Sequence, residues 1–290
     1  MSKDALANFL ERQQWLGALE EPVQQGVRKA FSDVAGQPVR NALHGTWLGH
    51  PVHVVLTDVP IGSWTAAIVF DALSMSGSRK PLEYAAEASI TVGLLGAVAS
   101  AVTGLNDWAE VDGKPRRVGL MHGLLNLGAA SLFLGSLIAR KRRSRSSGKG
   151  LAVLGYVLAT AAAKLGGTLV YEHRLGVDHS CEQPLPNDFL PVMNDSDLPE
   201  NKPTRATANG THVLLVKQNG RVLALAETCS HLGGPLSEGK LEDCTIRCPW
   251  HGSRFSLETG EVIDGPAVHP QTRLDATIRD GNIEVRMARP

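Results

Sequence analysis

The sequence predicts a multidomain α + β protein: an N-terminal four-helix transmembrane bundle followed by a small all-β domain. Three observations indicate this division. Four apolar stretches, each near the length of a helix that crosses a bilayer, occupy the first part of the chain. Short strand-like runs separated by turn residues fill the last third. Two cysteine–histidine pairs lie within that strand-rich region.

The composition excludes several other classes of protein. The chain has 290 residues, which is enough for two domains. It carries 29 Lys and Arg against 29 Asp and Glu, so its formal charge is zero and we expect no nucleic-acid partner. The first residues include acids and no early apolar core, unlike a cleavable signal peptide. Any membrane targeting is therefore expected from internal segments.

Residues 1–49 precede the apolar stretches and are expected to form amphipathic helices. Apolar side chains recur at roughly helical spacing over residues 4–32. We expect one or two helices here, interrupted near Gly17 and Pro22, that lie on the bundle or on the membrane surface.

The membrane domain is expected over residues 50–178. A membrane helix needs about 20 apolar residues, and the four stretches approach this length. Small residues recur in them at spacings of three and four, as in membrane helices that approach closely. A soluble four-helix core is the alternative interpretation. The four stretches are 52–73, 86–105, 119–139 and 151–171.

Basic residues in the connections predict the orientation of the bundle. The connection at 74–82 carries Arg79 and Lys80 without an acid, and the connection at 140–149 is intensely basic. The connection at 106–118 mixes both signs. Since Lys and Arg are enriched in cytoplasmic loops, the first and third connections are expected inside. Both termini, and the β domain, are then expected on the outer face of the cell membrane.

The β domain is expected over residues 186–290, after a linker at 179–185. Turn dipeptides such as NG, TG and DG separate the strand-like runs, as in antiparallel hairpins. The runs are THVLLVKQ, RVLALAE, CTIRCP, SRFSL, EVI, RLDATIRD and NIEVRM.

Two loops of this domain carry soft metal ligands. Cys229 and His231 form one pair, and Cys248 and His251 form the other. Two thiolates and two imidazoles can hold zinc, or a [2Fe–2S] cluster with the thiolates on one iron and the imidazoles on the other. Each loop supplies one residue of each kind, so each can contribute one ligand to each iron. Zinc has no need of that arrangement, and the pattern favours the cluster.

The stretches CSHLGGP, CPWHGSRF and TGEVIDGPA together resemble the Rieske [2Fe–2S] domain over about residues 186–288. The resemblance implies that Cys229 and Cys248 are sulfur ligands and that His231 and His251 are nitrogen ligands. It also implies that Gly265–Pro266–Ala267 is the proline loop that covers the cluster.

The chain departs from the Rieske proteins of cytochrome bc complexes. That branch has an extra cysteine in each cluster loop, joined in a disulfide, where this sequence has Gly234 and Trp250. Phe255 stands where that branch often has a tyrosine, while Ser253 remains as a donor. Fewer hydrogen bonds to the cluster sulfurs predict a low reduction potential. The domain therefore resembles the ferredoxins of ring-hydroxylating oxygenases. Cys181 and Cys244 are not expected to bind the cluster.

Four histidines of the membrane half are expected at one depth, on the outer side. The stretch around them resembles a bacterial membrane domain of unknown function, the family numbered 2231, over about residues 44–178. Buried ionisable residues in a bundle are costly, so these histidines have three interpretations. They form a polar cap with Asp58, Asn106 and Asp107, or bind haem b between facing helices, or form a quinone or metal site. The four are His50, His53, His122 and His173.

These features predict a membrane-bound protein that carries single electrons between a redox partner, either a protein or a quinone, and its own membrane domain. The expected cofactors are a [2Fe–2S] cluster and, in one interpretation, haem b. An accessory or redox-sensing module without turnover is the alternative. A complete oxygenase is disfavoured, because too few residues follow the cluster domain to build a 2-His-1-carboxylate iron site. We expect a component of an oxidoreductase system, embedded in membrane lipid.

Overall fold

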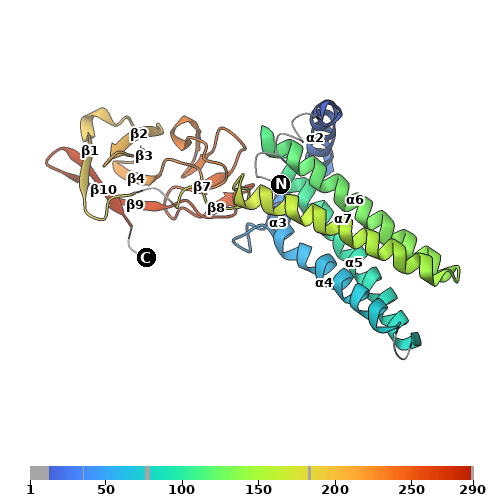
Figure 1. Cartoon of the computed structure of the whole chain (residues 1–290). Helices are drawn as coiled ribbons and strands as arrows, with labels where there is room; N and C mark the ends of the chain where they lie inside the picture. Colours follow the sequence, from blue (N-terminus) through green and yellow to red (C-terminus); the bar gives the residue numbers. More distant parts are fainter. Residues whose placement is uncertain (1–12, 35, 76–78, 182–183, 289–290) are drawn as a thin grey trace. The chain divides into compact units, whose positions relative to one another are not determined.

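The computed structural model describes residues 13–34, 36–75, 79–181 and 184–288 (Figure 1). The chain forms two compact units. The first comprises Met1–Gly36 and Val52–Leu175, and the second comprises Gln37–Pro51 and Gly176–Pro290. The expected N-terminal region 1–49 is thus divided between the units. Its first apolar positions, within residues 1–12, lie outside the described residues.

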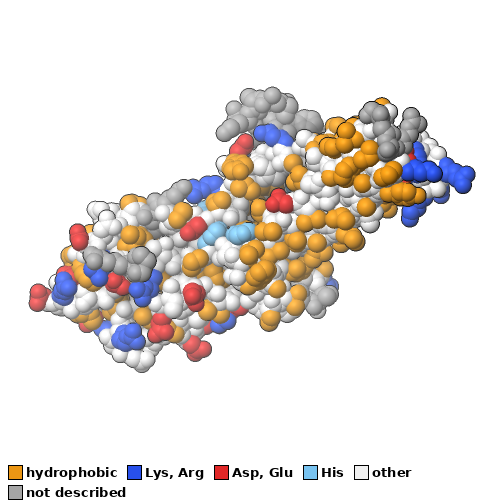
Figure 2. All heavy atoms as spheres, turned by 90° about the horizontal axis from the view of Figure 1, so that it is seen from below, with side chains coloured by type: hydrophobic (Ala, Val, Ile, Leu, Met, Phe, Trp, Pro, Cys, Tyr) orange, Lys and Arg blue, Asp and Glu red, His pale blue; other side chains and the backbone are white. Residues whose placement is uncertain are grey.

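Four long helices form most of the first unit. All four are long and apolar enough to cross a membrane. Large aliphatic side chains project outward from them, such as Leu95, which is 68% exposed, and Val157, which is 61% exposed. Figure 2 shows hydrophobic side chains spread over this helical unit. The expected transmembrane bundle is confirmed. Its helices are α4 (Val52–Leu73), α5 (Arg79–Trp108), α6 (Lys114–Lys141) and α7 (Arg145–Tyr171).

Helix α2 (Gln14–Val34) packs on this bundle and corrects one expectation. It runs without a break through Gly17 and Pro22, where we expected an interruption. Contacts before and after the proline hold it: Leu16 is fully buried, and the Gln24 amide donates to the carbonyls of Trp108 and Val111 at 3.0 and 2.6 Å. These tertiary contacts offset the hydrogen bond that the proline removes.

The four membrane helices are two matched hairpins. Helix α4 packs against α5 and α7, and α6 packs against α7 and α5. A shift of 69 positions relates α4 to α6, pairing 53 with 122, 64 with 133 and 71 with 140. Each matched pair meets in space. The rings of His53 and His122 are 6.4 Å apart, those of Trp64 and Phe133 stack at 4.3 Å, and Arg140 bonds Asp71. Matched residues that contact each other indicate a pseudo-twofold axis along the bundle.

Glycines of α5 and α7 repeat the same pattern with a shift of 62 positions, 93 with 155 and 104 with 166. A Cβ atom at Gly93 would collide with the Trp64 ring, and one at Gly104 would lie 2.7 Å from His53. In the second hairpin Gly155 and Gly166 lie in the same way against Phe133 and His122, at 3.1 and 3.2 Å. Each ring on the axis therefore lies against a glycine of its own hairpin, which allows close helix packing.

The second unit contains two antiparallel sheets and the short helix α3 (Gln37–His44). One sheet has six strands in the order β1-β10-β9-β4-β3-β2, and the other has four in the order β5-β6-β7-β8. Buried aliphatic and aromatic residues fill the space beside each sheet. The first sheet contains β1 (Leu190–Asn194), β2 (Thr204–Ala208), β3 (Thr211–Gln218), β4 (Arg221–Ala226), β9 (Arg273–Arg279) and β10 (Asn282–Met287). The second contains β5 (Lys240–Glu242), β6 (Thr245–Arg247), β7 (Arg254–Ser256) and β8 (Val262–Asp264).

The hairpin turns of the large sheet follow the predicted turn signals. Asn209–Gly210, Asn219–Gly220 and Asp280–Gly281 each have two successive residues with positive φ. This conformation suits the right-handed twist of the flanking strands, and Asn-Gly and Asp-Gly adopt it readily. The all-β domain is confirmed, and the seven predicted runs coincide with β3, β4 and β6 to β10.

Candidate metal centre

The first candidate ligand loop joins β4 to β5 and closes on itself around Cys229. The amide of Cys229 donates to the Gly234 carbonyl, and the amide of Gly233 donates back to the Cys229 carbonyl, both at 2.9 Å. Gly233 has a φ of 82°, which a residue with a side chain rarely adopts. Buried Glu227 accepts the Ser237 amide and hydroxyl and fixes the base of the loop.

The second loop joins β6 to β7 and is closed in the same way. The amide of Cys248 donates to the Ser253 carbonyl at 2.8 Å, and the amide of Gly252 donates to the Cys248 carbonyl at 3.2 Å. Gly252 again has positive φ, at 76°. Both loops thus present a cysteine at their start and a histidine near their tip.

The two thiols are neighbours in the interior, with exposed fractions of 1% for Cys229 and 3% for Cys248. The hydrogen bond between them raises the pKa of Cys229 well above its ordinary value and lowers the pKa of Cys248 to about 7. Cys248 therefore loses its proton more readily than Cys229, and the deprotonated thiolate is the form that binds a metal.

The two imidazoles also form a pair, with the rings of His231 and His251 5.0 Å apart at 84°. Among the described residues, no group forms a hydrogen bond with the buried Nδ1 of His231. Burial holds the pKa of His231 well below its ordinary value, and the neighbouring His251 acts in the same direction. A neutral ring with a buried, unshared nitrogen can bind a metal ion.

The four side chains therefore form two separate pairs, one of sulfur and one of nitrogen. A [2Fe–2S] cluster with cysteines on one iron and histidines on the other uses this division, whereas tetrahedral zinc draws all four donors to one point. Within the described part of the chain, no three His, Cys, Asp or Glu side chains are grouped so as to bind one ion together. The donor set fits the two-iron cluster.

Comparison with known proteins identifies the domain that carries these two loops. The family model of the Rieske [2Fe-2S] domain matches residues 188–278. The 3-phenylpropionate/cinnamic acid dioxygenase ferredoxin subunit of Escherichia coli (strain K12) is 34% identical over 89 residues, which are 30% of this chain and 83% of that protein. The chain belongs to the Rieske [2Fe–2S] family. Its Rieske domain is the β part of the second unit, and it indicates a [2Fe–2S] cluster and electron transfer.

Other similar proteins differ in the share of their own length that the match covers. Apoptosis-inducing factor 3 of Homo sapiens is 32% identical over 118 residues, which are 41% of this chain. The chain spans only 20% of the length of that protein and 18% of its Mus musculus counterpart. The ferredoxin of carbazole 1,9a-dioxygenase from Nocardioides aromaticivorans IC177 is 27% identical, with a TM-score of 0.34, and the match covers 35% of this chain and 100% of that one.

The first unit matches a second family, described as a predicted membrane protein (DUF2231), over residues 49–179. This match and the four long apolar helices show a multi-pass membrane protein. The expected pairing of a Rieske domain with a DUF2231 membrane domain is confirmed.

The residues that we expect to lower the reduction potential of the cluster lie close to the two ligand loops. A Cβ atom at Gly234 would lie 2.8 Å from the Cys248 sulfur and 3.1 Å from the Trp250 ring. Phe255 is fully buried. The Ser253 hydroxyl accepts the Ala267 amide at 2.9 Å, so the expected proline loop Gly265–Ala267 is bonded to the second ligand loop.

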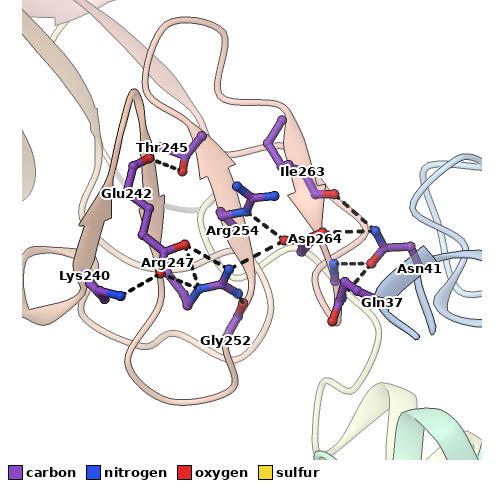
Figure 3. A network of polar contacts seen from close by, with 11 residues as sticks. Gln37, Asn41, Lys240, Glu242, Thr245, Arg247, Gly252, Arg254, Ile263 and Asp264 are labelled. Carbon is purple, nitrogen blue, oxygen red and sulfur yellow. Dashed lines mark hydrogen bonds and ion pairs between the residues drawn. The ribbon is translucent and has the colours of Figure 1, made fainter. Parts of the chain in front are cut away.

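A polar network formed by side chains of β5 to β8 supports the second ligand loop (Figure 3). Arg247, which precedes Cys248, donates to the Gly252 carbonyl at 2.9 Å and forms an ion pair with Glu242. The pKa of Glu242 is held below its ordinary value by this arginine. Arg254 donates to Asp264 at 2.7 Å, which joins the loop to the end of β8.

Two of the four membrane histidines come together. The Nδ1 of His53 bonds the Ser100 carbonyl at 2.9 Å, and the Nδ1 of His122 bonds the Ala162 carbonyl at 2.8 Å. Because a carbonyl only accepts, both Nδ1 atoms carry the proton and both Nε2 atoms keep a lone pair. The Nε2 of His122 accepts a hydrogen bond from the Asn126 amide at 3.1 Å.

The other two histidines do not join this pair within the described residues. His50 is exposed, belongs to the second unit and contacts the Pro51 carbonyl at 3.4 Å. His173 follows α7 in the chain. No described hydrogen bond links the paired rings to Asp58 or Asp107, the carboxylates of the expected polar cap.

The residues that sequence reasoning missed lie in α3. Asn41 bonds the chain just before the proline loop, and His44 is buried against Gly265. More than 200 positions separate these residues from the loop that they contact. No local pattern in the sequence marks such a contact.

Proposed function

We propose that this protein passes single electrons between a redox partner and its membrane unit, through a cluster held by the two ligand loops. The ligands are Cys229, His231, Cys248 and His251. The observation that carries the proposal is that the same two loops form both a pair of buried, hydrogen-bonded thiols and a pair of adjacent imidazoles. When bound, a [2Fe–2S] cluster accepts and releases one electron at a time.

The residues around the cluster have distinct roles in this proposal. The backbone turns that end at Gly233 and Gly252 orient each cysteine, and the Arg247 network holds the second loop in place. Trp250 is 57% exposed and lies beside His251, with the rings 6.3 Å apart. Exposed aromatic side chains are enriched where proteins dock, so an external redox protein contacts the domain at Trp250. The matched relative in Escherichia coli is named as a ferredoxin subunit of a dioxygenase, which supports a protein partner of this kind.

The second redox site in this proposal is the histidine pair on the axis of the membrane bundle. A backbone carbonyl fixes the tautomer and orientation of each ring, as is usual for metal-binding histidines. In this proposal His53 and His122 offer Nε2 to a haem iron or to a hydroxyl of a hydroquinone, and the Asn126 amide gives up its bond to His122 when the ligand enters. We assign no role in this site to His50 or His173.

The cluster lies on the outer face of the cell membrane in this proposal. Basic side chains gather at the end of the helical unit where α6 leads into α7 (Figure 2). Arg140 and Arg145 pair with Asp71 and Glu83, while Lys141, Arg142 and Arg143 remain as surface charges of that connection. Since such loops stay cytoplasmic, α7 leads outward to the Rieske domain.

The test uses the full chain in detergent, with its cluster reduced by dithionite and the excess reductant removed. Visible spectra before and after pyridine treatment report haem, and reoxidation by added decylubiquinone reports a quinone site. The double variant His53→Ala/His122→Ala is compared with His212→Ala, an exposed histidine of the Rieske domain.

We expect the double variant to lose either the haem spectrum or the rapid reoxidation by quinone, with its cluster intact. Loss of haem identifies an iron site, and loss of quinone-dependent reoxidation identifies a quinone site. If the wild type contains no haem and all three proteins reoxidise at the same rate, the membrane unit does not exchange electrons through this pair.

A further inference from the structure

Helix α3 belongs to the second unit, although the four membrane helices separate it from the Rieske domain in sequence. The Rieske family match spans residues 188–278 and does not include it. The segment Gln37–Pro51 is therefore an addition by this chain to the Rieske domain. Its contacts reach the loop that lies against the cluster ligands.

Asn41 makes the central contacts of this segment (Figure 3). Its amide nitrogen donates to the Ile263 carbonyl and to the Asp264 carboxylate, both at 3.2 Å. Its amide oxygen accepts the Gly265 amide at 3.0 Å and the Gln37 side chain at 2.9 Å. One side chain thus holds three successive residues at the end of β8.

These contacts continue to a cluster ligand in two short steps. Gly265 begins the proline loop, and the amide of Ala267 donates to the Ser253 hydroxyl at 2.9 Å. The Ser253 carbonyl in turn accepts the amide of Cys248 at 2.8 Å. Ser253, Ala267 and Cys248 are all buried, so this connection runs through the interior of the domain.

His44 fills the space beside the same loop. It is 1% exposed, and a Cβ atom at Gly265 would lie 3.1 Å from its ring. Helix α3 therefore covers the proline loop with a fitted side chain as well as a hydrogen-bonded one.

We infer that Asn41 is a positioning residue for the cluster: by fixing the Gly265–Ala267 loop against Ser253, it keeps water from the Cys248 side and holds the reduction potential down. This inference rests on the proposed ligand set. Two ferric ions, two sulfides and two thiolates sum to zero charge, so the added electron leaves a net charge of minus one. Water stabilises the charged, reduced form more than the neutral one. Loosening the loop must therefore raise the potential.

The experiment compares the full-length protein with Asn41→Ala and with Val39→Ala, a control on an exposed position of the same helix. Midpoint potentials are measured by redox titration, and exchange of the Gly265 and Ala267 amides is measured by mass spectrometry. We expect Asn41→Ala to raise the potential and to speed amide exchange about five- to tenfold, the factor that one net hydrogen bond represents. Val39→Ala should change neither quantity.

A second variant covers the case in which Asn41→Ala fails to retain the cluster. Asn41→Gln keeps the amide but displaces it by one methylene, and we expect a smaller rise in potential. If the cluster-bearing variants keep the wild-type potential and wild-type amide exchange, the inference is wrong. Failure of the proposed ligand set looks different, because the wild-type protein would then lack iron and sulfide.

Discussion

Gly234 of the first ligand loop lies against Cys248 and Trp250 of the second. Even a methyl group there would lie 2.8 Å from the Cys248 sulfur, closer than ordinary contact allows. A cysteine there, which the resemblance implies for the bc-type Rieske proteins, would require the side chains of Cys248 and Trp250 to shift. The tight contact at Gly234 fits a site without the extra disulfide, and all four cysteines are free.

The ligand assignment predicts which side chains the cluster needs. His231→Ala or His251→Ala should lower bound iron and acid-labile sulfide more than about tenfold. Replacing a residue that only supports a metal ligand already lowers metal affinity by about that factor, and loss of the ligand itself should cost more. Cys244→Ser should retain the cluster, because Cys244 lies half-buried in the turn between β5 and β6. Iron and sulfide analysis after reconstitution checks both statements. Retention of a full cluster by either histidine variant would remove that residue from the ligand set.

The side chains near the sulfurs predict a low reduction potential. Phe255 is fully buried and has no hydroxyl, which leaves Ser253 as a hydroxyl that can donate to a sulfur. Each such donor stabilises the reduced cluster, so few donors mean a low potential. Rieske centres span about −150 to +300 mV, and this one should lie toward the negative end. A titrated midpoint above roughly +200 mV on that scale would contradict the interpretation.

At the scale of elements, the sequence pattern predicted the long membrane helices and the strands with strong turn signals. The strands β1, β2 and β5 were not predicted. The reasons are physical: β5 has only three residues, β1 shows no alternation of buried and exposed side chains, and the buried positions of β2 are alanines, which give a weak hydrophobic signal. Pro22 gave a false interruption of α2, because tertiary contacts of Leu16 and Gln24 outweigh one missing hydrogen bond.

The hairpin repeat of the membrane unit was beyond sequence reasoning. Some matched positions are identical, such as His53 and His122, but others hold different residues, with Trp64 against Phe133 and Asp71 against Arg140. The differing pairs are complementary across the axis, and the few identical positions are too widely spaced to be recognised as a repeat from the sequence. The ion pairs between the two hairpins have one polarity. The acid belongs to the α4–α5 hairpin and the base to the α6–α7 hairpin, as in the Glu83–Arg145 ion pair at 2.8 Å.

The pseudo-twofold axis of the membrane bundle predicts what happens when Asp71 and Arg140 are exchanged. Asp71 and Arg140 are buried and paired, so Asp71→Asn leaves an uncompensated charge and should cost about 3–5 kcal/mol of unfolding free energy. Because the positions are matched, the exchanged variant Asp71→Arg/Arg140→Asp should recover part of that loss. Unfolding in mixed detergent micelles measures both. If the exchanged variant is less stable than Asp71→Asn, the two positions are not equivalent.

At the scale of the whole molecule, both domains could be identified from local motifs, and the candidate ligands followed from loop spacing. The role of α3 could not, since Asn41 and Gly265 meet only in the folded chain. The pairing of His53 with His122 likewise needed the structure to separate it from His50 and His173.

The proposed topology predicts that the Rieske domain is accessible from outside the cell. Arg279→Cys introduces an exposed thiol, in a Cys181→Ser background that removes the exposed native one. An impermeant thiol reagent should label this variant in intact cells and should not label Cys181→Ser alone. Labelling that appears only after lysis would place the cluster in the cytoplasm, and the argument from basic loops would then fail for this protein.

The central claim is that Cys229, His231, Cys248 and His251 hold a [2Fe–2S] cluster in a membrane protein. Iron, sulfide and zinc analysis of full-length protein purified from membranes tests it most directly, together with electron paramagnetic resonance after reduction. We predict two irons and two sulfides per chain, as the cluster formula requires, with a spectrum of mixed nitrogen and sulfur ligation. One zinc per chain with no sulfide, the composition of a tetrahedral site, would contradict the account.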